Sequence, residues 1–143
     1  MKKILVVVLM LAGTLFAVEK APKGKYAIIL QAGAETNEGR ARAVHALLYA
    51  TDLAEHGYDV ALIFEGAGAL WANELEKPEN PFHKHYLRIK QLGIVEEVCD
   101  YCADAHDVKQ DLSKEQERLL VGDYEGHPSI SRWADEGYRI IVL

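Results

Sequence analysis

The sequence predicts an α/β fold, a three-layer α/β/α sandwich around a mainly parallel sheet of four to five strands. The runs at 26–30, 60–64 and 138–143 are almost continuously apolar, as expected of strands that are buried on both faces. Helical patterns separate these runs along the chain. This alternation predicts parallel strands joined by right-handed crossovers, with helices on both faces of the sheet.

The first strand and helix have clear boundaries in the sequence. A strand is predicted at 26–30, followed by a turn and then an Ala- and Leu-rich helix. Thr36 or Asn37 is suited to cap the start of this helix, because a short polar side chain can accept a backbone N–H there. The helix is expected to run to about His56, where Gly57 stops it.

The middle of the chain continues the same alternation. A strand is expected at 60–64, a short helix follows through 71–75, and a longer helix is predicted over 82–92. Gly93 ends that helix. A third, shorter strand is expected at 94–98.

The last third of the chain has weaker patterns. A helix is predicted over 113–120, because Ser113 is a good cap and the residues after it favour helix. A short strand near 119–121 is a further expectation. A helix starting at 127–129 and ending at Gly137 then precedes the final strand at 138–143.

The N-terminal residues are predicted to be an export signal. Lys2 and Lys3 are followed by an apolar run, and polar sequence begins at Glu19. The run is shorter than the ~20 apolar residues of a membrane-spanning helix. We therefore expect a signal peptide over 1–17, a polar lead-in over 18–24, a single domain over 25–143, and a periplasmic or secreted protein without a membrane anchor. The alternative is a buried first strand beginning at Ile4.

The composition fits one soluble domain and argues against a nucleic-acid partner. The chain has 143 residues, half of them hydrophobic, and a formal net charge of −6. Half-apolar chains of this length can bury a core, whereas nucleic-acid binding needs a concentrated basic face. We expect no nucleic-acid partner.

Three loops are predicted to meet where ligands bind in such sheets, outside the carboxyl ends of the strands. They are Gln31 to Asn37, Glu65 to Gly68, and Cys99 to Cys102. The residues expected to line this cleft are Gly33, Glu65, Gly66 and Gly68. Gly66 and Gly68 also suggest a dinucleotide-binding loop, but Trp71 stands where that motif needs its third glycine. No cofactor is therefore expected.

The pair Cys99 and Cys102 is the strongest candidate for chemistry. Backbone N–H groups at the start of a helix stabilise a thiolate, which is the reactive form of cysteine. Two thiols at this spacing can also close a disulfide, so that one resolves chemistry begun by the other. Cys99 is predicted to be the exposed nucleophile and Cys102 its partner. The alternative is two buried cysteines or an inert disulfide.

The histidines offer further possibilities. His106 lies four residues after Cys102 and is a candidate third metal ligand with the two cysteines, the alternative being a surface or capping side chain. The segment His127-Pro128-Ser129 is interpreted as the start of a helix, with an imidazole in the cleft as the alternative. His83 and His85 are expected on a solvated surface, and the side that His45 faces is left open.

Several segments, taken together in this order, resemble the DsrE-like family of small sulfur-handling α/β proteins. They are Tyr26–Leu30 with its following helix, Phe64–Gly68, Val98–Ala103, Gly126–Ser129 and Glu136–Tyr138. The resemblance implies a parallel-sheet sandwich that assembles as trimers or hexamers. It also implies that a cysteine in the Cys99–Cys102 region accepts sulfur as a persulfide and passes it on.

The hypothesis that follows is an exported sulfur-carrier, sulfur-relay or thiol-redox protein acting through Cys99 and Cys102. If active, it would be a sulfurtransferase-like persulfide carrier rather than a hydrolase or an NAD-dependent enzyme. Its expected partners are a second copy of the chain and a sulfur donor or acceptor protein. Two alternatives remain open, a non-enzymatic binding or assembly subunit with a structural disulfide and a Cys/His metal-binding protein.

Overall fold

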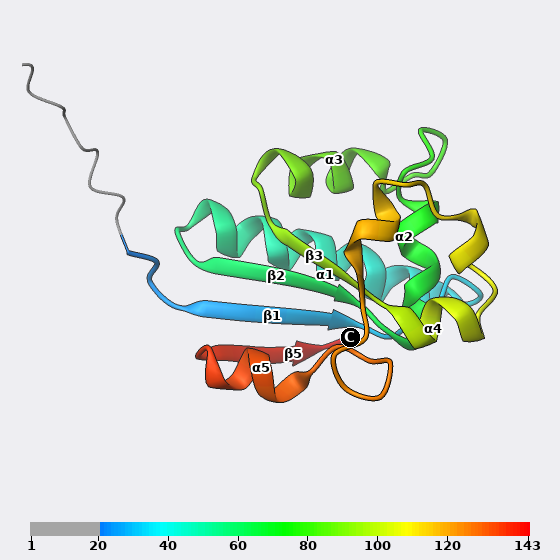
Figure 1. Ribbon diagram of the computed structural model, residues 1–143. Helices are drawn as coiled ribbons and strands as arrows, with labels where there is room; N and C mark the ends of the chain where they lie inside the picture. Colours follow the sequence, from blue (N-terminus) through cyan, green and yellow to red (C-terminus); the bar gives the residue numbers. More distant parts are fainter. Residues whose placement is uncertain (1–20) are drawn as a thin grey trace, which may run out of the picture.

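Five parallel strands form the centre of the molecule in the order β4-β3-β2-β1-β5 (Figure 1). Their bounds are β1 Lys25–Leu30, β2 Asp59–Phe64, β3 Val95–Cys99, β4 Leu120–Val121 and β5 Tyr138–Val142. The computed structural model describes residues 21–143, so the predicted signal peptide over 1–17 lies outside the described residues. The predicted α/β sandwich around a parallel sheet is confirmed.

Two of the three apolar runs, β1 and β2, lie inside the sheet as their sequences predict, whereas the third, β5, forms one edge. β1 pairs with β2 on one side and β5 on the other, so that Ile29 lies between Ile63 and Val142. The chain builds the sheet outward from β1 to β4 and then returns to the other side of β1 for β5. This reversal leaves the carboxyl ends of the strands bordered by loops from both halves of the chain.

One face of the sheet carries most of the helices and the larger hydrophobic core. Helix α1 (Asn37–Glu55) and helix α3 (His83–Gln91) lie together on this face, away from α5 (Figure 1). The 3₁₀ helix η1 (Gly66–Leu70), helix α2 (Trp71–Glu74) and helix α4 (Asp100–Ala105) follow the carboxyl ends of β2 and β3. Leu62, Phe64 and Val98 point from the strands into this core.

Within residues 21–143, the opposite face is covered by one short helix, α5 (Ile130–Asp135). Trp133 of α5 packs on the small side chains Ala27 and Ala61 and on the isoleucines Ile29 and Ile63. Tyr138 meets Trp133 edge to face and donates a hydrogen bond to Asp59 Oδ2 at 2.9 Å. The two faces of the sheet therefore differ greatly in the extent to which helices cover them.

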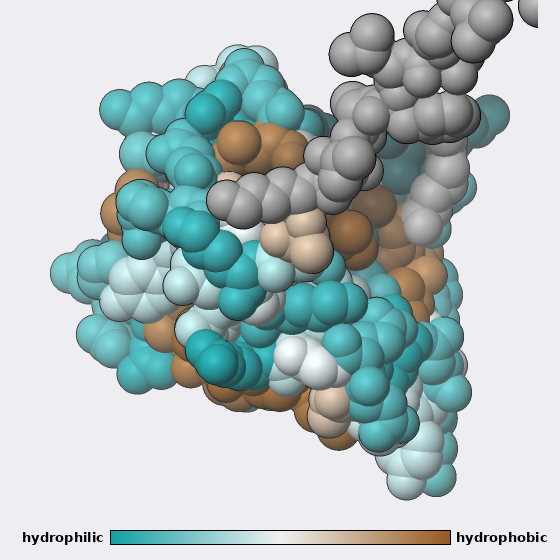
Figure 2. Space-filling model, turned by 90° about the vertical axis from the view of Figure 1, so that its left-hand side faces the viewer, coloured by the Kyte–Doolittle hydropathy of each residue, from teal (hydrophilic) through white to brown (hydrophobic). Residues whose placement is uncertain are grey.

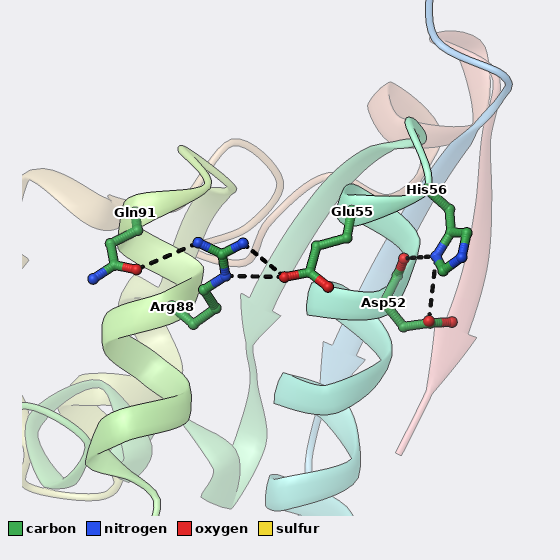
Figure 3. A network of polar contacts seen from close by, with 5 residues as sticks. All are labelled: Asp52, Glu55, His56, Arg88 and Gln91. Atoms are coloured by element: carbon green, nitrogen blue, oxygen red, sulfur yellow. Dashed lines mark hydrogen bonds and ion pairs between the residues drawn. The ribbon is translucent and has the colours of Figure 1, made fainter.

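Figure 3 shows an ion pair that joins the C-terminal parts of α1 and α3. The Arg88 guanidinium donates two hydrogen bonds to Glu55 Oε1, at 3.0 and 2.7 Å, and one to Gln91. Beside them, His56 Nδ1 contacts Asp52 within the last turn of α1. Both side chains of the Arg88–Glu55 pair are almost half exposed, so this ion pair contributes little to stability.

The predicted helix boundaries agree with the structure in most places. Thr36 caps α1, because its Oγ1 accepts the Gly39 N–H at 2.9 Å. The predicted helix over 113–120 is wrong. Ser113 does cap this segment, because its Oγ accepts the Gln116 N–H at 3.3 Å and its own N–H donates to Gln116 Oε1. Only the 3₁₀ helix η3 (Gln116–Leu119) follows, because the buried Gln116 side chain donates inward to the Ala72 carbonyl and the chain pairs with β3 from Leu120 onward.

None of the helices within residues 21–143 is both long and apolar enough to cross a membrane.

Candidate functional site

The two cysteines lie at the junction of β3 and α4, as the sequence predicts. Cys99 is the last residue of β3 and the N-cap of α4, and Cys102 lies one turn into the helix. A disulfide joins them. The Cys99 Sγ also accepts the backbone N–H of Cys102 at 3.2 Å. Cys99 thus occupies the position at a helix start where a thiolate is stabilised.

The expectation that Cys99 is exposed is wrong. Its exposed fraction is 0%, compared with 5% for Cys102. Cys99 is buried because it ends a strand inside the larger core, next to Val98, and because a later loop covers it. Both cysteines are therefore buried in the core, and Cys102 keeps the small exposed fraction of the pair.

The covering group is His127, which lies in the segment predicted to start a helix. Its Nδ1 lies 3.3 Å from Cys99 Sγ and 3.7 Å from Cys102 Sγ. The ring also packs against Tyr101 of α4, with ring centroids 4.9 Å apart. An imidazole in contact with both sulfurs can donate a hydrogen bond to a thiolate or exchange a proton with it.

A tight turn places His127 over the sulfurs. Tyr124 and His127 exchange two backbone hydrogen bonds across this turn, at 2.8 and 2.9 Å. Glu125 and Gly126 at its tip both have positive φ, 49° and 86°. The Gly126 carbonyl then accepts the Tyr101 N–H at 2.9 Å, which joins the turn to the start of α4.

His127 also precedes a helix, so both interpretations weighed for it hold. Ser129 caps α5 by accepting the Arg132 N–H. The buried Pro128 joins this cap to His127. One sequence feature could have predicted the contact of His127 with the cysteines. His127 follows a predicted strand that ends at the same edge of the sheet as Cys99. That signal depends on a two-residue strand, β4, whose pairing with β3 the sequence indicates only weakly.

A charged cluster ties the loop before His127 to β3. Arg132 of α5 donates to both carboxylate oxygens of Glu97, at 2.6 and 2.8 Å, and lies 3.2 Å from Asp123. Glu97 is only 7% exposed and stands two residues before Cys99. Burial lowers the pKa of the Arg132 guanidinium, but the hydrogen bond and charge of Glu97 outweigh this effect and the pKa is raised. The Arg132 guanidinium therefore keeps its positive charge.

The three predicted loops do meet at this edge of the sheet. The Gly68 N–H donates to the Gln31 carbonyl at 3.1 Å, and Gln31 Nε2 donates to Glu65 Oε2 at 2.8 Å. A Cβ on Gly68 would lie 2.0 Å from the Leu30 carbonyl oxygen, so only glycine fits there. The 3₁₀ helix η1, which contains Gly68, packs against α4.

A mostly apolar cavity of about 360 Å³ opens on the α5 face beside these loops. Of the four residues predicted to line the cleft, Glu65 lines this cavity. Gly33, Gly66 and Gly68 are not among its lining residues and serve as backbone positions in the loops. The lining residues are Ile29, Gln31, Ile63, Glu65, Pro128, Ile130, Trp133, Ile140 and Val142.

The other histidines lie away from the sulfurs. His106 is exposed at the C-terminal end of α4, so it does not join the cysteines as the third ligand expected from its spacing. Among the described residues, the Cys/His/carboxylate group with metal-ligand geometry is Cys99, Cys102 and His127, whose ligand atoms lie within 4.8 Å of one another. His83 Nδ1 contacts the Leu75 carbonyl at 2.7 Å, and the exposed His45 stacks on Tyr49.

A comparison with protein families identifies the family to which this chain is related. The model of the DsrE/DsrF-like family matches residues 24–143, nearly all of the described chain. The chain belongs to the DsrE/DsrF-like family.

A curated relative of this DsrE-like protein is an uncharacterized protein of Methanocaldococcus jannaschii. The two are 36% identical over 100 residues, which cover 70% of this chain and 78% of the relative. No solved structure matches the chain significantly. The predicted family is thus confirmed.

Proposed function

We propose that this DsrE-like protein is an exported sulfur carrier that works through Cys99 and Cys102. The observation that supports the proposal most strongly is the contact of one imidazole, His127, with both sulfurs of a disulfide at the start of a helix. Helix-start N–H groups and a neighbouring imidazole both favour a thiolate over a thiol. Such a pair is suited to sulfur exchange.

The cycle starts when an external dithiol reduces the disulfide and leaves Cys99 and Cys102 as thiols. The thiolate of Cys102, the less completely buried of the two cysteines, then attacks the outer sulfur of a donor persulfide, R–S–SH. The S–S bond of the donor breaks, R–S⁻ leaves with the electron pair, and Cys102 becomes a persulfide. No net oxidation occurs in this transfer.

Release of the sulfur follows one of two routes. A thiolate of an acceptor protein attacks the outer sulfur, takes it as a new persulfide and leaves Cys102 as a thiolate. Alternatively, the Cys99 thiolate attacks the Cys102 sulfur, hydrosulfide leaves, and the Cys99–Cys102 disulfide forms. Cys99 is suited to this resolving role because its sulfur is buried, held by the Cys102 N–H and in contact with His127.

The setting of the carrier is part of the proposal. A signal peptide over 1–17 would direct the protein to the periplasm or outside the cell, where disulfides persist unless a reductant acts on them. We expect a homo-oligomer, a trimer or hexamer, and donor and acceptor proteins as partners. The exposed apolar side chains Ile130 and Val142, 51% and 53% exposed, are consistent with an interface near α5 and β5.

Single-cysteine variants test the carrier role. Reduced protein is treated with inorganic polysulfide and its intact mass is measured. Cys99→Ala is expected to gain one sulfur on Cys102 and keep it, because the resolving thiol is gone. Cys102→Ala is expected to gain much less, since its remaining sulfur is buried. Wild type is expected to gain sulfur transiently and to return to the disulfide.

The double variant Cys99→Ala/Cys102→Ala is the control, because it has neither sulfur and should gain none. Sulfur addition to the double variant at the wild-type level would contradict the proposal. So would an absence of sulfur on wild type and on both single variants. The second result, together with a lower melting temperature for the double variant, would favour a structural disulfide in a binding or assembly subunit.

A further inference from the structure

The side-chain cluster around the disulfide is also arranged as a metal site. We infer that, once the disulfide is reduced, Cys99, Cys102 and His127 bind a thiophilic metal ion such as Zn²⁺. This inference goes beyond sulfur transfer and does not depend on it. It also replaces the metal site expected from His106 with one built on a histidine that lies 25 residues after Cys102.

The distances to the imidazole already match those around tetrahedral zinc. With Zn–S near 2.3 Å and Zn–N near 2.0–2.1 Å, tetrahedral angles place nitrogen and sulfur ligands about 3.5 Å apart. His127 Nδ1 lies 3.3 Å from Cys99 Sγ and 3.7 Å from Cys102 Sγ. The imidazole is therefore positioned for coordination before any movement of its loop.

Only the two sulfurs have to separate. In a tetrahedral site they would lie about 3.7 Å apart. The Cys99 and Cys102 Cα atoms are 5.2 Å apart, on a strand end and the first turn of a helix, and C-x₂-C is a common ligand spacing in zinc proteins. Side-chain rotation after reduction is therefore sufficient, without a change of backbone.

The surroundings favour bound thiolates. The Cys102 N–H already donates to Cys99 Sγ, and this contact supports a sulfur that carries negative charge. Tyr101 packs on the His127 ring and restricts its orientation. Thiolate and imidazole together prefer Zn²⁺ or Cu⁺ over the hard ions that carboxylates select.

The site forms only in the reduced protein, so its chemistry includes a reductant. A dithiol or phosphine supplies two electrons to the disulfide and gives two thiols, and the reductant is oxidised. Metal binding then displaces the two thiol protons to solvent. Three protein ligands leave one coordination position open to water or an external ligand. Metal and incoming sulfur would therefore compete for the same thiolates.

The test uses the full chain. The protein is reduced with a phosphine, and the phosphine is then removed under nitrogen. One equivalent of Zn²⁺ per chain is expected after removal of unbound metal, and none on the oxidised protein. Co²⁺ added in place of Zn²⁺ should give thiolate-to-cobalt charge-transfer absorption. His127→Ala is expected to weaken Zn²⁺ binding by roughly 10-fold or more, as loss of a ligand should cost at least as much as loss of a second-shell partner.

His106→Ala is the matched control and should bind Zn²⁺ as wild type does. Circular dichroism of each variant checks its fold, and Cys102→Ser provides a second variant that removes one ligand. Absence of Zn²⁺ from the reduced wild type, or equal affinity in wild type and His127→Ala, would overturn the inference. Sulfur loading is measured on metal-free protein by mass, so the two proposals can fail independently.

Discussion

At the scale of single residues, the account depends on what holds His127 over the sulfurs. The turn that carries His127 contains Gly126 at φ +86°, a conformation that residues with a Cβ rarely adopt. A Cβ on Gly126 would also lie 3.1 Å from the Tyr101 Cβ. Gly126 therefore allows the close approach between the turn and the start of α4.

Substitution of this glycine tests that role. Gly126→Ala is expected to lower the free energy of unfolding by about 2 kcal/mol, because it combines left-handed backbone strain with a tight contact. Gly137→Ala is the control, since Gly137 has φ +85° but nothing within 4 Å of its Cβ position. Denaturant unfolding should show a smaller loss for Gly137→Ala, and equal losses would contradict a specific role for the Tyr101 contact.

At the scale of elements, Arg132 links three parts of the site. It joins α5 to Glu97 of β3 and to Asp123 in the segment before His127. Breaking a buried pair by removing one partner is costly, because the other charge stays buried without compensation. The Arg88–Glu55 pair of Figure 3 is more exposed and serves as a contrast.

Arg132→Met should therefore destabilise the protein by about 2–3 kcal/mol, whereas Arg88→Met should cost less than about 1 kcal/mol. Glu97→Gln in the Arg132→Met background should recover part of the loss, because a buried amide costs less than a buried carboxylate. Thermal and denaturant unfolding of the three variants measures these differences. Equal effects of Arg132→Met and Arg88→Met would contradict the assigned importance of the buried link.

The elements also show what the sequence could predict and what it could not. The apolar run at 26–30 and the Thr36 cap are local signals, and both led to correct elements. The role of His127 is not local, since it depends on the pairing of β4 with β3 and on a turn with positive φ at two residues. The expected helix over 113–120 failed because the Gln116 side chain found tertiary partners that local propensity does not include.

At the scale of the whole molecule, the two faces of the sheet are unequal. The face that carries α1 and α3 holds the larger core, while α5 alone covers the other. Figure 2 looks at the end of the molecule where the strands begin. Polar side chains dominate that end, and apolar side chains reach the surface in several separate places, one of them along its lower edge, the level of α5 and β5 in Figure 1. The exposed Ile130 and Val142 lie toward the opposite end, where α5 begins and β5 ends, and both line the cavity beside Gln31 and Glu65.

This asymmetry leads to a prediction about assembly. Light scattering of the wild type is expected to give the mass of a homo-oligomer. Ile130→Asp should reduce that mass, because a carboxylate is costly to bury in an apolar interface. Leu87→Asp on α3 is the control, since Leu87 is 42% exposed on the other face. A monomeric wild type, or the same dissociation in both variants, would contradict an interface at α5.

The most direct test of the sulfur-carrier proposal is the chemical state of Cys99 and Cys102 in protein purified without any reductant. Intact mass and alkylation before and after reduction should find both sulfurs in a disulfide or one of them as a persulfide. After reduction, both should react with an alkylating agent in denaturant, and Cys102 should take up sulfur from polysulfide in the folded protein. Two free thiols in the untreated protein, with no sulfur uptake when polysulfide is added, would contradict the account.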